Sequence, residues 1–284
     1  MSTLPTGAQT PAPMAFKAIC DFIEFNGGIK ITEEKAYLLD SRLSPLMREL
    51  KCTDYLSLLN KASADLSGQI RIKIVDAMTT NETLWFRDGG PFEMLAEYII
   101  PELVKNAGNA TVRIWSAACS SGQEPYSLAI LIHELKFKNP SVSPGRFEII
   151  ATDLSPTILE SAAKGVYDGL AIGRGLSQNL RDKYFNAEGK NWRVRDEIKK
   201  MVSFKHFNLK DNYGSLGKFD LIMCRNVLIY FSDTLKKDIM ERQARALNPG
   251  GVYMVGASES VSNYTQKFVM KNYKNSIYYQ TVPV

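Results

Sequence analysis

Four polar side chains lie in or just after turns that follow short apolar runs, which the sequence predicts to be buried strands. Asp153 ends the run FEIIATD, Arg225 and Asn226 follow KFDLIMC, and Glu124 stands in the small-residue segment Ala117–Pro125 after TVRIWSA. In open parallel sheets ligands bind at the carboxyl ends of the strands, so such side chains can meet around one ligand. A carboxylate at the position of Asp153 can accept hydrogen bonds from both hydroxyls of an adenosine ribose. Asp153 therefore suits an adenosine ribose, and the turns after the other strands are the places to look for the rest of a ligand site.

Each of these segments also has a simpler interpretation. Ala117–Pro125 has one glycine, matches GxGxxG poorly, and can be a tight turn without a ligand. Asp153 can cap the helix SPTILESAA, although Ser155 is the better cap. No asparagine-proline-proline-aromatic motif follows KFDLIMC. This argues against an enzyme that methylates a base or amide nitrogen.

The segment Met78–Asp88 is polar and aromatic, and it joins a helical part of the chain to the part with predicted strands. Junctions between domains are frequent ligand sites. The segment can equally be a linker with a buried Trp85 and Phe86.

Short apolar runs rich in β-branched residues alternate with longer amphipathic segments from about residue 110 onward. The predicted buried strands are 111–117, 146–153, 218–224 and 250–257, and the run 276–282 is expected to be an added edge strand. The segments EPYSLAILIHEL, SPTILESAAK and SDTLKKDIMERQARAL are predicted to be helices. This alternation indicates an α/β fold with a mostly parallel sheet and helices on both faces.

The chain before residue 110 shows no strand pattern. Apolar residues recur at helical spacing between about Ala15 and about Met78, where Thr53 or Asp54 can cap one helix. The first residues are rich in Pro, Thr, Ala and Gly, which is typical of a mobile tail. The expected divisions are a tail at 1–13, a helical domain with linker at 14–88 and a sheet domain at 89–284.

Between Lys164 and His206 the alternation of strand and helix patterns breaks down. Short aromatic runs flank Glu188 and Gly189, which is typical of a hairpin turn. We expect a small antiparallel β insertion at about 180–206, mounted on the sheet domain.

The composition is that of an ordinary globular protein, with 45% hydrophobic and 23% charged residues. The net charge of +5 suits an acidic partner and is too small for the basic stripe of a nucleic-acid binder. No apolar run approaches the roughly 18 residues that cross a bilayer, so we expect no membrane insertion and a cytoplasmic location. The four cysteines form no CxxC pair and the two histidines lack a partner at ligand spacing, so no metal site is expected.

Five motifs occur in the order found in a known family. They are TTNETLWFRD, WSAACSSGQEPYSLA, ATDLS, FDLIMCRNVLIYF and LNPGGVYMVGASES. With them the chain resembles the CheR chemoreceptor glutamate methyltransferases from about Phe16 to about Tyr279. The resemblance implies an S-adenosylmethionine-dependent, Rossmann-like methyltransferase domain behind an all-α domain. Trp85 in place of the commoner Phe and Gln123 in place of the commoner Glu are small departures.

The resemblance also implies a site for S-adenosyl-L-methionine, whose product is S-adenosyl-L-homocysteine. The residues that would form it, from the methionine end to the closing turn, are Asn81, Thr83, Arg87, Glu124, Asp153, Asn208, Leu209, Arg225 and Asn226. In this set Asp153 would hold the ribose, and Asn208 with Leu209 would flank the adenine.

The implied reaction is methyl transfer to glutamate side chains in the cytoplasmic helices of chemoreceptors. A glutamate with a pKa of about 4.3 is already an anionic nucleophile at pH 7, so no general base is required. The enzyme still has to orient the acceptor carboxylate, and Arg87 can do so with paired N–H donors. Tyr230 is the second candidate for that role. The alternatives are a surface ion pair of Arg87 with Asp88 and a core aromatic at Tyr230.

Two regions suit partners of the kind that the family binds. One helical region contains the basic residues Lys35, Arg42, Arg48 and Lys51. The family docks its N-terminal helices on acidic receptor helices, and a solvated charged face is the alternative. The insertion corresponds to the family's β-subdomain, which in some members grips a receptor's C-terminal peptide. We expect a monomer.

Two other functions stay open. One is a methyltransferase that acts on RNA or a small molecule, against which the mild net charge and the missing motif argue. The other is a regulatory scaffold that binds S-adenosylmethionine without catalysis, against which the presence of Arg87, Asp153 and Tyr230 argues.

Overall fold

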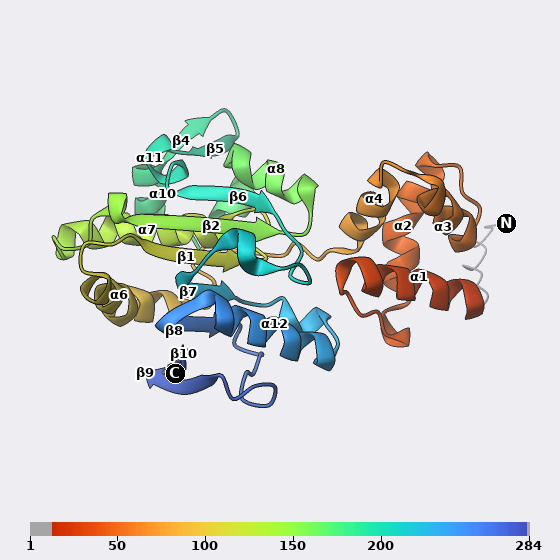
Figure 1. The fold of residues 1–284 in the computed structure, drawn as a ribbon. Coiled ribbons are helices and arrows are strands. Elements are labelled where there is room, and N and C mark those ends of the chain that lie inside the picture. The colour runs from red at the N-terminus through yellow and green to blue at the C-terminus, as the bar shows by residue number, and fades with distance from the viewer. Residues whose placement is uncertain (1–12, 283–284) are drawn as a thin grey trace. The chain divides into compact units, whose positions relative to one another are not determined.

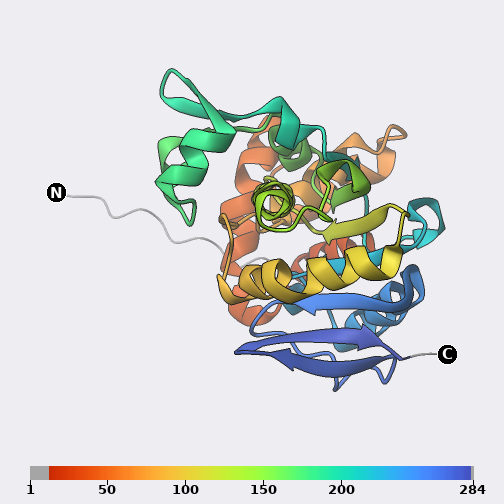
Figure 2. The same ribbon diagram turned by 90° about the vertical axis from the view of Figure 1, so that its left-hand side faces the viewer.

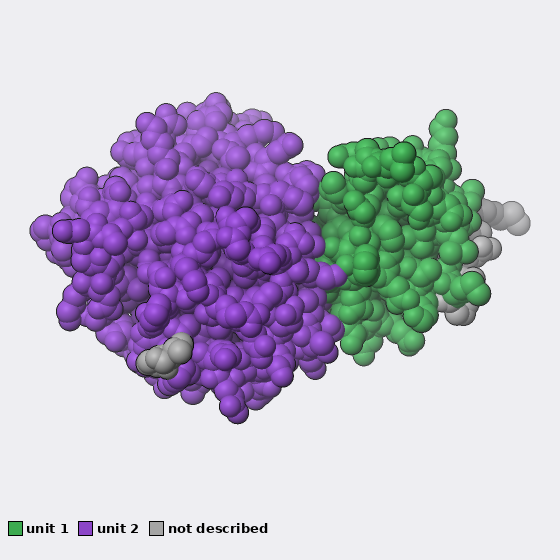
Figure 3. All heavy atoms as spheres, in the orientation of Figure 1, with its two compact units in different colours: residues 1–79 green, residues 80–284 purple. Residues whose placement is uncertain are grey.

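The computed structural model describes residues 13–282, and the chain divides into two compact units, residues 1–79 and residues 80–284 (Figure 3). The expected tail at 1–13 lies outside the described residues, apart from Pro13 at the start of the first helix. No helix within 13–282 is long and apolar enough to cross a bilayer.

The first unit is helical, as its apolar spacing predicts. Its elements are α1 (Pro13–Gly27), η1 (Glu33–Lys35), α2 (Tyr37–Glu49), α3 (Tyr55–Ala64) and α4 (Gln69–Met78). Asp54 caps α3, because its carboxylate accepts the Ser57 N–H at 2.8 Å while the Ser57 hydroxyl accepts the Asp54 N–H at 3.2 Å. Fully buried residues such as Ile23, Leu43 and Leu58 form the core of this unit.

Arg42, one of the basic residues predicted to face a receptor, has a structural role. Its Nη1 donates to the carbonyl oxygens of Met78 at 2.8 Å and Thr79 at 2.9 Å, where α4 ends. A cation at this position satisfies carbonyls that have no partner within the helix. The exposed members of the basic set are Lys35, Arg48 and Lys51.

A seven-stranded sheet organises the second unit (Figure 1). Its strands are β1 (Val112–Ala117), β2 (Phe147–Asp153), β6 (Val202–His206), β7 (Phe219–Cys224), β8 (Leu247–Val255), β9 (Phe268–Tyr273) and β10 (Ser276–Thr281). Their order in space is β6-β2-β1-β7-β8-β10-β9, in which the first five strands are parallel and β10 pairs antiparallel with both β8 and β9. The order reverses between β1 and β7, the kind of switch point at which such sheets bind ligands.

The run 276–282 is not the edge strand that the sequence predicts. It forms β10, in which Tyr279 pairs with Tyr253 of β8 on one side and with Met270 of β9 on the other. The edge strand is β9, and four of its six residues are exposed. Because β9 lacks a buried alternation, its sequence carries little strand signal.

Helices cover both faces of the sheet, as predicted (Figures 1 and 2). They are α5 (Gly90–Met94), the π-helical turn η2 (Leu95–Ile99), α6 (Ile100–Ala107), α7 (Gln123–Lys138), α8 (Pro156–Lys164) and α12 (Asp233–Ala246), with 3-10 turns η3 (Pro144–Arg146), η4 (Tyr213–Leu216) and η5 (Leu228–Tyr230). Successive strand residues point to opposite faces, so Ile114 and Ile149 pack with α5 to α7, while Trp115 and Ile150 pack with α12.

A second, antiparallel sheet forms the predicted insertion. It consists of β3 (Val166–Asp168), β5 (Asn191–Val194) and β4 (Phe185–Glu188) in that spatial order, and the helices α9 (Gly169–Gly173), α10 (Gln178–Tyr184) and α11 (Asp196–Lys199) surround it. The hairpin turns at Gly189, whose φ is +62°. The strand at 202–206, which the sequence groups with the insertion, instead pairs with β2 in the main sheet as β6.

Candidate functional site

Five residues other than glycine adopt left-handed backbone in two turns of the main sheet and in the segment before α5. They are Phe86 (φ +48°), Asp88 (+70°), Ala118 (+62°), Ser120 (+51°) and Asn226 (+58°). The turns follow β1 and β7, the two strands at the switch point. Left-handed backbone costs an L residue roughly 1–2 kcal/mol, and such residues gather where function requires a particular geometry.

Asp153 fastens the turn after β1 to the end of β2. Asp153 is 7% exposed, and its carboxylate accepts the N–H of Ser120 at 2.8 Å and the N–H of Ser155 at 3.0 Å. Ser155 rather than Asp153 caps α8, since its Oγ accepts the Ile158 N–H at 3.1 Å. A carboxylate can accept about four hydrogen bonds, so two N–H groups orient it and are compatible with a ribose donor.

The turn after β1 has no space for larger side chains. A Cβ at Gly122 (φ +92°) would lie 3.1 Å from both the Ala162 Cβ and the Tyr167 hydroxyl. The Tyr167 hydroxyl in turn donates to the Ser121 carbonyl at 2.7 Å. Glycine here lets the turn pack against α8 and the small sheet.

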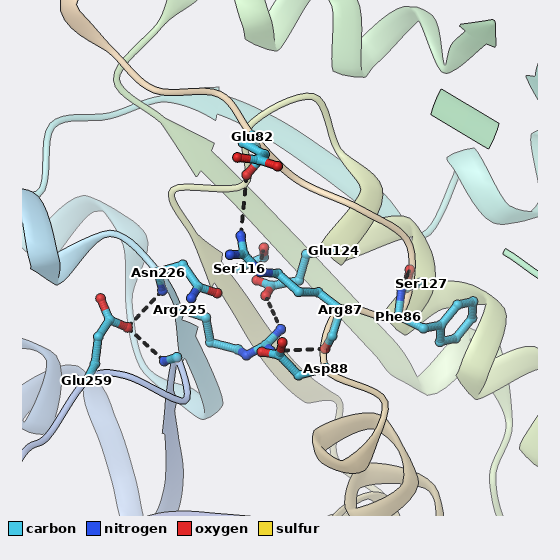
Figure 4. A network of polar contacts seen from close by, with 11 residues as sticks. Glu82, Phe86, Arg87, Asp88, Ser116, Glu124, Ser127, Arg225, Asn226 and Glu259 are labelled. Atoms are coloured by element: carbon cyan, nitrogen blue, oxygen red, sulfur yellow. Dashed lines mark hydrogen bonds and ion pairs between the residues drawn. The ribbon is translucent and has the colours of Figure 1, made fainter. Parts of the chain in front are cut away.

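Arg225 joins three segments at the same edge of the sheet (Figure 4). Its side chain is 1% exposed, and Nη1 donates to Glu124 Oε2 of α7 at 3.1 Å. Its Nη2 donates to Asp88 Oδ2 at 2.7 Å and to the Arg87 carbonyl at 3.0 Å. The guanidinium therefore ties the turn after β7 to α7 and to the segment before α5.

Glu124 is a buried acid within this network. Its side chain is 13% exposed, and its second oxygen accepts the Ser116 hydroxyl at 2.8 Å. Burial raises the pKa of Glu124 above its ordinary value, and Arg225 and Ser116 oppose that effect. Arg225 Nε is buried and has no partner among residues 13–282. An unsatisfied buried donor of this kind is consistent with a polar molecule bound nearby.

Trp85 anchors the segment 80–89 to the small sheet. It is fully buried, its Nε1 donates to the Ala171 carbonyl at 3.1 Å, and its ring meets Tyr167 and Phe185 edge to face at 4.9 and 5.2 Å. A Cβ at Gly175 would lie 2.1 Å from the Trp85 carbonyl oxygen, so this approach requires glycine. The interpretation of Trp85 as a buried side chain of the segment is confirmed.

Arg87 is half-buried, and its Nη1 donates to the Glu82 carbonyl at 3.4 Å (Figure 4). The alternative of an Arg87–Asp88 ion pair is wrong for the described residues, because Asp88 pairs with Arg225 instead. Asn81 begins the same segment, and its carbonyl accepts the Ser120 hydroxyl at 2.9 Å. The segment thus runs beside the turn after β1. Thr83, also in the predicted set, is half-buried.

Strand β6 brings Asn208 and Leu209 beside the end of β2. The intervening Phe207 donates its N–H to the Asp153 carbonyl at 2.9 Å. The Asn208 Oδ1 accepts the Lys210 N–H at 3.0 Å, and Leu209 is 6% exposed. The two residues predicted to flank an adenine therefore follow the strand that neighbours the predicted ribose ligand.

Glu259 is a residue of this edge that the sequence reasoning missed. Its Oε2 accepts the N–H groups of Asn226 and Gly256, both at 2.7 Å (Figure 4). The signal was available, because Glu259 closely follows a predicted strand within the motif LNPGGVYMVGASES, as Asp153 ends another. Asp88 and Ser116 were also missed as members of the polar network.

Tyr230 ends η5 at the same edge. Its ring is half-buried and packs against the apolar cluster on the α12 face. This contact agrees with a core aromatic, and a direct role in the reaction stays a prediction. Among residues 13–282, no group of three or more His, Cys, Asp and Glu side chains could hold a metal ion.

Comparison with known proteins covers nearly the whole chain. The family model "CheR methyltransferase, SAM binding domain" matches residues 81–277, and "CheR methyltransferase, all-alpha domain" matches residues 14–79. The chain is 44% identical over 274 residues to chemotaxis protein methyltransferase 1 of Vibrio cholerae, covering 96% of this chain and 98% of that protein. It is 46% identical over 260 residues to chemotaxis protein methyltransferase Cher2 of Pseudomonas putida, covering 91% and 94%.

Proposed function

The chain belongs to the CheR methyltransferase family, and we propose that it methylates glutamate side chains in the cytoplasmic helices of chemoreceptors. Dependence on S-adenosylmethionine and a place in chemotaxis follow from the family and from relatives that match nearly the whole chain. The glutamate acceptor is the proposed part, and the observation that carries it is the half-buried Arg87 beside the network in which Arg225 binds Glu124 and Asp88.

The residues at the carboxyl edge of the sheet fit the cofactor. The oriented carboxylate of Asp153 suits a ribose, and the small residues of the turn after β1 would let a ligand approach the backbone. Asn208 and Leu209 would flank the adenine. Glu124 would lie near the amino group at the methionine end, and the unsatisfied Arg225 Nε is a donor that a bound molecule could use.

The chemistry asks little of the protein beyond orientation. S-adenosylmethionine supplies a methyl group on a sulfonium sulfur, which a carboxylate can accept without further activation. A glutamate side chain is ionised at pH 7, so no residue of this chain has to remove a proton. Arg87 would hold the acceptor carboxylate by charge-assisted hydrogen bonds, and Tyr230 would be the second ligand. Exclusion of water would strengthen both contacts.

Arg225 would act through Arg87 rather than on the substrate. Its guanidinium binds the Arg87 carbonyl, Asp88 and Glu124, so it fixes the backbone from which the Arg87 side chain extends. Fixed positions matter because a misplacement of about 1 Å can cost roughly a hundredfold in rate.

The acceptor would be recognised in part by charge. Lys35, Arg48 and Lys51 are exposed on the helical unit and suit an acidic helix, whereas Arg42 is engaged at the end of α4. We further propose that the small sheet binds a receptor's C-terminal peptide and that the protein acts as a monomer.

Transfer of radiolabelled methyl from S-adenosylmethionine to membranes that carry chemoreceptors tests the proposal. Base-labile label on the receptor would establish a carboxyl methyl ester. Cofactor binding without receptor labelling across a broad receptor panel would overturn the assigned acceptor and favour a regulatory scaffold.

Arg87→Ala tests the orientation of the acceptor. We expect a loss of about a hundredfold in kcat/KM for receptor labelling, because the carboxylate loses its paired donors. Lys105→Ala removes an exposed cation of α6 that pairs with Glu102, and should label receptor at the wild-type rate. An Arg87→Ala variant as active as Lys105→Ala would remove the assigned role.

A further inference from the structure

One carboxylate connects the turns that follow two neighbouring strands. Glu259 lies after β8, and its Oε2 accepts the N–H of Gly256 in its own turn and the N–H of Asn226 in the turn after β7, both at 2.7 Å. Its Oε1 accepts the N–H of Ile229 at 3.3 Å. Three backbone donors from two turns thus converge on a single side chain, and Figure 4 shows the contact with Asn226.

The local geometry requires an acid of this length. A glutamine would keep one acceptor oxygen and turn an NH2 group toward N–H donors, so at least one contact would become repulsive. The space is also closed, since a Cβ at Gly256 would lie 2.6 Å from the Asn226 Nδ2 and 2.8 Å from the Glu259 Oε2. The left-handed backbone of Asn226 (φ +58°) is therefore held by contacts outside its own turn.

Contacts from two sides hold the turn after β7 in place. Arg225 binds Glu124 and Asp88 through its side chain, toward α7 and the segment before α5. The next residue, Asn226, is bound through its backbone by Glu259, toward β8. A substitution of Glu259 would remove the hydrogen bond to the Asn226 backbone and leave the ion pairs of Arg225 in place.

We propose that Glu259 is a positioning residue of the cofactor site. It holds the backbone of the turn Arg225–Tyr230 so that the Asn226 side chain meets the cofactor and Tyr230 keeps its place in η5. The inference rests on the proposed role of Asn226 in the cofactor site. Glu259 itself binds backbone groups and acts through that turn.

The test compares Glu259→Gln with Asp220→Asn, which makes the same chemical change at the opposite edge of the sheet. Asp220 accepts the Arg113 N–H at 2.8 Å and the Asn248 side-chain amide at 2.7 Å, so it too joins neighbouring strands. The affinity for S-adenosylhomocysteine, measured by calorimetry without any receptor, should fall about tenfold in Glu259→Gln. Asp220→Asn should bind within twofold of wild type, and Glu259→Asp should lie between wild type and Glu259→Gln.

Amide hydrogen exchange of the peptide around residues 224–231 gives a second readout. We expect faster exchange at Asn226 and Ile229 in Glu259→Gln and wild-type exchange there in Asp220→Asn. Wild-type cofactor affinity in a folded Glu259→Gln variant would overturn the inference, as would an equal loss of affinity in both variants. Since receptor is absent, a wrong acceptor assignment would leave this result unchanged.

Discussion

The amino and carboxyl ends of the parallel strands form two edges of the main sheet. Each of these edges has an arginine that joins neighbouring segments, but the surroundings of the two arginines differ. At the amino edge, Arg113 binds Glu148 at 2.6 Å and donates to the carbonyls of Lys218 and Leu216, with its side chain 28% exposed. At the carboxyl edge, Arg225 is 1% exposed and binds two carboxylates. The amino edge keeps its arginine in contact with water, whereas the carboxyl edge removes its guanidinium from water, although the partner Asp88 stays 37% exposed.

The backbones differ in the same direction. Where the amino edge needs left-handed backbone it uses glycine, as at Gly217 (φ +78°) and Gly250 (φ +73°). The carboxyl edge also uses glycine, at Gly122 (φ +92°), but places non-glycine residues at positive φ as well, among them Ala118, Ser120 and Asn226. Within residues 13–282, non-glycine residues at positive φ occur at the carboxyl edge of the main sheet and not at its amino edge. The contrast indicates that the carboxyl edge holds a fixed geometry at a cost in backbone strain that the amino edge avoids.

The largest expected effect on stability comes from replacing the buried arginine. Arg225→Ala should destabilise the second unit by about 3–5 kcal/mol, because it leaves Glu124 buried without its cation. Arg113→Ala should cost about 1–2 kcal/mol, because water can replace part of its contacts. All three tryptophans lie in the second unit, at positions 85, 115 and 192, so fluorescence-monitored urea unfolding reports this unit. Equal losses in the two variants would refute the contrast between the edges.

A smaller effect is expected when a glycine and a non-glycine residue at positive φ are each replaced by the other type. Gly217→Ala should cost about 2 kcal/mol, since φ +78° with ψ −154° excludes a side chain and the new Cβ would lie 2.8 Å from Arg113 Nη1. Ala118→Gly should stay within about 0.5 kcal/mol of wild type, because relief of strain offsets the added freedom of the unfolded chain. The same unfolding assay measures both. A large loss in Ala118→Gly would mean that its methyl group, not its backbone, matters.

The smallest effect concerns pH at the carboxyl edge. Burial raises the pKa of Glu124 in the folded state above its unfolded value of about 4.3. Between the unfolded and the folded pKa of Glu124, the folded state binds more protons than the unfolded state. The contribution of Glu124 to the free energy of unfolding therefore falls as pH rises through this range and increases as pH falls. The free energy of unfolding of wild type minus that of Glu124→Gln should increase from pH 7 toward pH 5. A difference that decreases over this range would contradict the assigned direction.

The sequence predicts the fold where burial leaves a periodic pattern. The buried strands β1, β2, β7 and β8 and the cap at Ser155 are confirmed, because alternation, apolar runs and cap types are local signals. The sequence does not predict the exposed edge strand β9, and it assigns β6 to the small insertion rather than to the main sheet. Pairing of β6 with β2 depends on contacts between residues about fifty positions apart, which no local pattern records.

The candidate site divides in the same way. Asp153 and Asn226 follow predicted strands, so their place at the carboxyl edge could be anticipated. The partners of Arg225 could not, because Glu124 and Asp88 are more than a hundred residues away in the chain. Arg42 shows the converse case, since its charge suggested a partner, while two of its hydrogen bonds are to carbonyls at the end of α4.

The sequence by itself determined the family, the two kinds of unit and the order of motifs that follow the strands. Only the tertiary structure decided that Arg225 is buried between two carboxylates, that Asp88 belongs to it rather than to Arg87, and that Glu259 fastens the turn of Asn226. The physical reason is that composition and periodicity report how each segment meets water. Hydrogen bonds between charged groups depend on which distant segments the folded sheet brings within about 3 Å of each other.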